Sequence, residues 1–70
     1  MPLVIAPLNT DLKIVKILVE EKLKKHLQSL GITINAIVKV VSCSNGNCII
    51  QIKDGRLAID RNVATKILVA

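Results

Sequence analysis

The sequence predicts a small, mainly β fold of five or six short strands with one α-helix. Two features predict it. Runs rich in β-branched residues are separated by tight-turn signals at Asn45-Gly46 and Asp54-Gly55, and only one stretch, about 19–30, carries apolar residues at helical spacing. Short strands expose unpaired edges unless they close on themselves, and a five-stranded, partly open barrel achieves this. We expect residues 1–70 to form a single domain of this kind.

Two strands are predicted before the helix. Residues 2–8 indicate a brief edge strand, because prolines bound this apolar run. Residues 12–18 indicate a second strand, rich in β-branched side chains. Its alternation is imperfect, and it places Leu12, Ile14 and Lys16 on one face.

The predicted helix over 19–30 carries one apolar stripe, formed by Leu23, Leu27 and Leu30. Gly31 follows the last stripe residue and suits the left-handed conformation that ends many helices. We expect the stripe to pack against the strands, so that the helix closes one end of the barrel.

The central hairpin is predicted by Asn45-Gly46, the strongest such signal in the chain. Before it, a corner at 32–35 leads into a strand at 36–42, and Asn35 suits a positive φ in that corner. The returning strand covers 48–53. With a two-residue turn and an unbroken register, the expected cross-strand pairs are Ser44–Asn47, Cys43–Cys48, Val41–Ile50 and Lys39–Ile52.

The remaining residues predict the closure of the sheet. Asp54-Gly55 forms a second tight turn and 56–59 a short strand. Asp60 is placed to cap a single helical turn over 61–65. Residues 66–70 form the last strand.

Composition indicates an aliphatic core and a basic surface. Apolar residues make up 51% of the chain, which has no Phe, Tyr or Trp, and the net charge is +5. A basic balance suits nucleic acid, an acidic protein or an anionic membrane, and it is also an ordinary route to solubility. The lack of aromatic rings argues against nucleic acid, because small RNA and single-strand binders stack bases on them. Without a signal-peptide pattern or an apolar run of spanning length, we expect a cytoplasmic protein.

The order of several segments along the whole chain resembles the FeoA family, small cytosolic accessory proteins of bacterial ferrous iron uptake. The segments that carry the resemblance are the helix, Leu30-Gly31-Ile32, the strand and hairpin, Leu57-Ala58-Ile59, Ala64 and Ile67-x-Val69. The resemblance implies an SH3-like barrel that binds FeoB, a membrane transporter with a cytosolic G domain, and modulates transport. This chain departs from the family in having Ile34-Asn35 where Pro-Gly is usual and Asp54 where a glycine is usual.

The weak candidates for a metal site are His26, Cys43 and Cys48. Zinc needs three or four ligands, and the chain has no CxxC motif and no second histidine. We therefore expect no resident metal or cofactor, and at most transient contact with Fe²⁺. The two cysteines face each other across the hairpin, close enough for a disulfide. A cytosolic environment nevertheless predicts free thiols.

A basic patch on the predicted helix consists of Lys22, Lys24 and Lys25. It is either a docking surface for an acidic partner such as a G domain, or a solvated helix face. For docking, we predict partner contacts at Lys22, Lys25, His26 and Arg56. No P-loop, nucleophile elbow or Gly-rich phosphate cradle is present, so we expect a binding module rather than an enzyme.

Three alternatives stay open at this point. The chain could be a basic SH3-like module that binds nucleic acid, or a metal-responsive regulatory domain like the C-terminal domain of iron-dependent repressors, which has the same barrel. An edge strand at 2–6 would also permit a homodimer.

Overall fold

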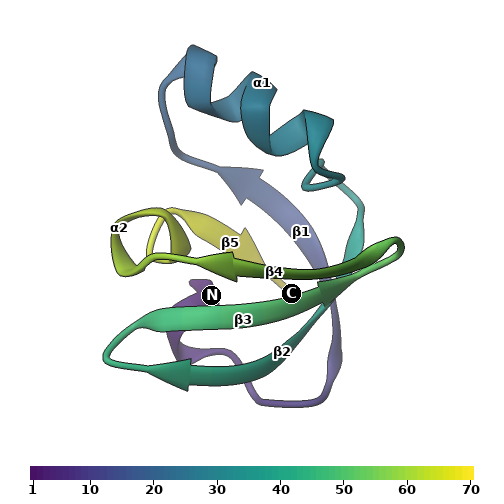
Figure 1. Ribbon diagram of the computed structural model, residues 1–70, viewed down its shortest axis with the longest axis vertical. Coiled ribbons are helices and arrows are strands. Elements are labelled where there is room, and N and C mark those ends of the chain that lie inside the picture. Colours follow the sequence, from purple (N-terminus) through teal and green to yellow (C-terminus); the bar gives the residue numbers. More distant parts are fainter.

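The computed structural model describes residues 1–70 as one five-stranded antiparallel sheet that curls into a barrel (Figure 1). The strand order is β4-β3-β2-β1-β5. This confirms the mainly β, SH3-like fold that the sequence predicts. In chain order the elements are the 3-10 helix η1 (Leu3–Ile5), β1 (Asp11–Ile17), α1 (Glu21–Ser29), β2 (Ile37–Ser44), β3 (Asn47–Ile52), β4 (Gly55–Ile59), α2 (Arg61–Ala64) and β5 (Ile67–Val69).

The interior contains only aliphatic side chains and Cys48, and no polar or charged residue is buried. Every strand contributes to it, and a β-branched core of this kind packs well between pleated strands. The 14 buried residues are Leu3, Leu12, Ile14, Ile17, Leu27, Ile32, Val38, Val40, Cys48, Ile50, Ile59, Ala64, Ile67 and Val69.

The first segment is not a strand, so the prediction for 2–8 is wrong. Ile5 N donates to Pro2 O at 3.2 Å and Ala6 N to Leu3 O at 3.1 Å, which makes the turn of η1. The turn aims Leu3 into the core, where it is fully buried. Burial of this side chain outweighs the extended preference of the apolar run. The predicted edge strand at 2–6 is therefore absent, and the homodimer stays a prediction.

A bulge in β1 explains the imperfect alternation of its sequence. Leu12 and Ile14 are buried as expected, but the register against β5 shifts between Ile14 and Lys16. The extra residue turns Lys16 outward and brings Ile17 into the core. The placement of Lys16 on the inner face was therefore wrong.

The hairpin tip has the predicted register, and the rest of the hairpin does not. Asn45 and Gly46 form a two-residue turn with positive φ values of 53° and 82°, and Cys43 pairs with Cys48. A second irregularity follows between Val40 and Ser42. It leaves Val41 without a partner, so that the observed pairs beyond it are Val40–Ile50 and Lys39–Gln51.

Helix α1 lies at one end of the barrel, as expected, but its leucines contribute unequally. Leu27 is 4% exposed, Leu23 is half-buried and Leu30 is 39% exposed. After Gly31, with φ of 97°, the chain turns sharply, and Ile32 N donates to Leu27 O at 2.9 Å. This Schellman-type ending places Ile32 in the core beside Leu27. The helix is thus fastened mainly at its C-terminal turn.

Side chains cap two of the free amides in the first turn of the short helix α2. The Asp60 carboxylate accepts from Val63 N at 2.9 Å, as predicted, and the Asn47 side chain accepts from Arg61 N at 2.8 Å. The second bond connects α2 to the tip of the β2–β3 hairpin. A methyl group built on Gly46 would lie 2.6 Å from the Arg61 side chain, so only glycine fits at that contact.

Candidate docking surface

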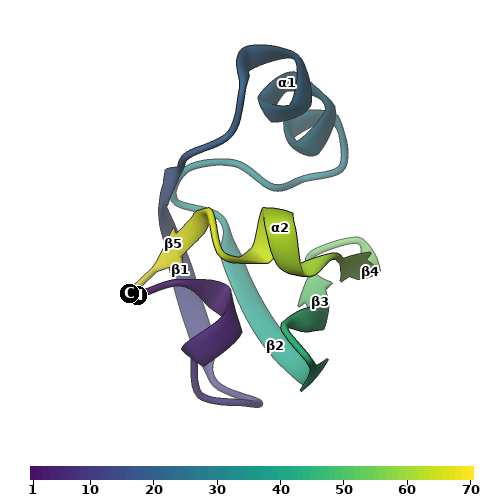
Figure 2. The same cartoon turned by 90° about the vertical axis from the view of Figure 1, so that its left-hand side faces the viewer.

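The four predicted partner contacts are all solvent-exposed, and they come from two elements. Lys22, Lys25 and His26 lie on α1, and Arg56 lies on β4. Figure 1 shows α1 on the side of β4 that faces away from β3, and Figure 2 gives the same arrangement from the side. Three of the four residues thus share the helix, and Arg56 lies on a separate element, the edge strand β4.

A groove runs between α1 and the β4–α2 segment. Its first part, about 270 Å³, is lined by His26, Leu27, Leu30, Ala58, Ile59, Asp60 and Val63. Its second part, about 340 Å³, is lined by Leu18, Val19, Glu20, Leu23, Asn62, Val63 and Lys66. The two parts adjoin at Val63, which lines both of them. Half-buried leucines and valines line the groove, which makes it a candidate docking surface.

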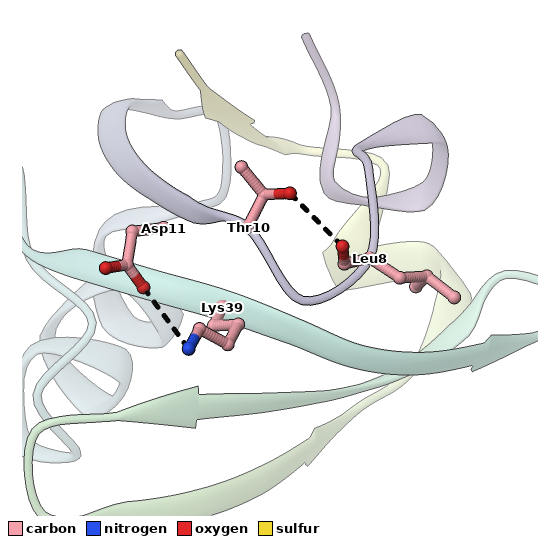
Figure 3. A network of polar contacts seen from close by, with 4 residues as sticks. All are labelled: Leu8, Thr10, Asp11 and Lys39. Carbon is pink, nitrogen blue, oxygen red and sulfur yellow. Dashed lines mark hydrogen bonds and ion pairs between the residues drawn. The ribbon is translucent and has the colours of Figure 1, made fainter.

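The outer face of the sheet carries a polar row that sequence reasoning missed. Asp11 pairs with Lys39, Lys39 with Gln51, and Gln51 with Arg56 across four neighbouring strands. Lys39 Nζ lies 3.7 Å from Asp11 Oδ1 (Figure 3). Both side chains are well exposed, so this ion pair adds little to stability. Arg56 ends this row of exposed polar side chains, which together offer hydrogen-bonding groups on the outer face of the sheet.

A second groove of about 550 Å³ borders this row between the end of α1 and the β3–β4 turn. Its charged and polar lining comes from Asp11, Thr33, Lys39, Gln51, Lys53 and Asp54. The row could not be read from the sequence, because the bulge at Val41 decides which residues stand opposite Lys39.

The structure joins Cys43 and Cys48 in a disulfide, which contradicts the expectation of free thiols. Their Cα atoms lie 4.1 Å apart, since the pair stands at a site of the hairpin without backbone hydrogen bonds. His26 lies in the groove beneath α1 and does not meet the cysteines. No three His, Cys, Asp or Glu side chains come together as a metal site.

A family model for the FeoA domain matches residues 1–70. The chain belongs to the FeoA family. This family is associated with ferrous iron transport, and its members are accessory proteins of that process. Comparison with curated proteins finds no match. No helix of this FeoA-family chain has the length and apolar character needed to cross a bilayer.

Solved structures of FeoA proteins have the same fold. A crystal structure of an iron uptake regulatory protein (FeoA) is 29% identical, with a TM-score of 0.83 over 99% of this chain and 92% of that one. FeoA from Chlorobium tepidum is 21% identical, with a TM-score of 0.87 over 99% of this chain and 68% of that one. Iron(II) transport protein A from Clostridium thermocellum is 17% identical, with a TM-score of 0.86 over 99% of this chain and 44% of that one. The last two show a shared fold alone.

Proposed function

We propose that this chain is a non-enzymatic, cytoplasmic accessory protein of ferrous iron uptake. It binds the cytosolic, G-domain part of the FeoB transporter and modulates transport. The observation that carries the proposal is the match of the FeoA domain model to residues 1–70. In this scheme ferrous iron is the cargo of the transporter, and the chain itself holds no resident metal or cofactor.

The basic side of α1 supports a docking role. Lys22 and Lys25 are exposed, and no acidic side chain is within ion-pair distance of either. The net charge of +5 favours association with an acidic surface and accelerates encounter at low salt. His26 lines the groove beneath α1, and Arg56 stands opposite Gln51 on the outer face of the sheet.

The test is calorimetric titration of this chain against the purified cytosolic domain of the transporter. The double reversal Lys22→Glu/Lys25→Glu should weaken binding about tenfold or more at low salt, because two favourable contacts become repulsive. The matched control is Lys13→Glu/Lys16→Glu, two exposed lysines of β1, which changes the net charge equally. Absence of binding by the unmodified chain overturns the proposed function. Equal weakening by both pairs assigns the effect to net charge and removes the helix as the contact.

A further inference from the structure

The two edges of the sheet differ in whether their outward backbone groups are hydrogen-bonded. The edge of β5 is covered by the first residues: the Met1 ammonium donates to Val69 O and Val69 N donates to Met1 O, each at 2.7 Å. Pro2 forms a bridge with Leu68 beside them. The edge of β4 has no such cover, because no hydrogen bond other than those of the β3–β4 ladder involves residues 55–59.

The free groups on β4 can be assigned from the register. Ile52 pairs with Gly55 across the two-residue turn, so these two residues exchange backbone hydrogen bonds. Backbone groups alternate along a strand, and those of Leu57 also face β3. The N–H and C=O groups of Arg56 and Ala58 therefore point away from the sheet. They form a short, unpaired edge that is ready to accept another strand.

The space beyond this edge is an apolar groove rather than packed core. The groove part of about 270 Å³ reaches from Ala58 and Ile59 on β4 to Leu27 and Leu30 on α1. Val63 of α2 forms its floor, and Leu30 keeps 39% of its surface exposed. In both views α1 lies beyond β4, on the side opposite β3 (Figures 1 and 2). A strand added to β4 would lie between that edge and α1.

The residues near the β4 edge indicate which side chains an added strand would carry. Side chains of an added strand alternate between two faces. One set would enter the groove beside Leu27, Leu30 and Val63, which suits aliphatic residues. The other set would stand beside Arg56, the basic end of the polar row on the outer face. Asp60 lines the groove at the Ile59 end of β4, so an acidic residue of the added strand is favoured at the other end, beside Arg56.

We propose that the free edge of β4 binds an extended segment of the partner, in which aliphatic and acidic residues alternate, by adding it as a sixth strand. The inference rests on the proposed function, since it assigns this segment to the cytosolic part of the transporter. Backbone hydrogen bonds to Arg56 and Ala58 supply affinity, and the groove and Arg56 select the side chains.

The test variant is Ala58→Pro, which removes the outward N–H and places a ring where the added strand must approach. Proline is tolerated on an edge strand when its nitrogen faces solvent, so the β3–β4 ladder stays intact. The matched control is Ala58→Val, which keeps the N–H and favours the extended conformation. Circular dichroism and thermal melting establish that both variants fold.

Calorimetry with the transporter's cytosolic domain should show at least a roughly tenfold weaker Kd for Ala58→Pro than for Ala58→Val, because only the proline removes the outward N–H. Equal binding by both variants overturns the strand addition while leaving the proposed function standing. A light-scattering measurement of mass gives a further outcome: a dimer that Ala58→Pro dissociates would assign the edge to a second copy of this chain and overturn the proposal.

A second experiment tests strand addition at β4 without the transporter domain. A short blocked peptide of alternating glutamate and valine is titrated into ¹⁵N-labelled protein. Amide shifts at residues 56–59 and along the C-terminal half of α1, absent in Ala58→Pro, support strand addition at β4 even if the domain does not bind, in which case only the source of the segment is overturned. A lack of shifts at millimolar peptide, or shifts confined to other elements, refutes it.

Discussion

Replacing Leu27 by alanine tests how α1 is held to the barrel. Leu27 is 4% exposed and belongs to the core, whereas Leu30, from the same predicted stripe, is 39% exposed. Truncation of a buried leucine costs about 2–5 kcal/mol, and the cost falls when neighbours can close the gap. The open groove beside Leu27 allows such closure. We therefore expect a loss of about 2–3 kcal/mol for Leu27→Ala and below about 1 kcal/mol for Leu30→Ala.

The assay is urea or thermal unfolding followed by far-ultraviolet circular dichroism, because the chain has no Phe, Tyr or Trp for fluorescence. For a domain of this size the larger loss corresponds to a fall of roughly 10–20 °C in Tm. Equal losses for Leu27→Ala and Leu30→Ala would refute the reasoning, since they would mean that the whole stripe fastens the helix. A loss below about 1 kcal/mol for Leu27→Ala would mean that α1 contributes little to the fold.

Three further results are expected, each measured as a change in thermal or urea stability. Cys43→Ser should cost about 2 kcal/mol through loss of a short disulfide loop, and reductant should lower the Tm of the unmodified chain but not of this variant. Asn35 has φ of 72°, so Asn35→Ala should cost about 1 kcal/mol, and Asn35→Gly should not; equal losses would exclude backbone strain as the cause. Asp60→Ala should cost about 1 kcal/mol through loss of the α2 cap, while Asp60→Asn retains most of it. A stable Asp60→Ala variant would show that Asn47 alone suffices as the cap.

The sequence predicts well those features that depend on neighbouring residues. Asn45-Gly46 determines the turn and hence the Cys43–Cys48 pair, and Asp60 caps the turn that follows it. Features that depend on distant contacts escape such reasoning. The bulge at Val41 changes the register because Val40 is fully buried, and no local pattern signals it. Similarly, residues 2–8 have the composition of a strand but wind into η1 to bury Leu3.

In the candidate docking surface too, only the features set by neighbouring residues could be predicted from the sequence. The basic side chains Lys22 and Lys25 could be assigned to an exposed helix face from their spacing alone. The groove beneath that helix could not, because it depends on Leu30 and Val63 coming together from separate segments. The free edge of β4 likewise requires the strand order, which places β4 and β5 at the two ends of the sheet.

The all-aliphatic interior has a practical consequence for solution studies. Apart from Cys48, every buried side chain ends in a methyl group. Methyl-selective NMR therefore observes nearly the whole interior at once, and no Phe, Tyr or Trp ring lies among these methyl groups. Binding at the surface can then be followed inward, residue by residue, from the methyl groups of Leu27 and Ile59 to those of Ile14 and Ile50.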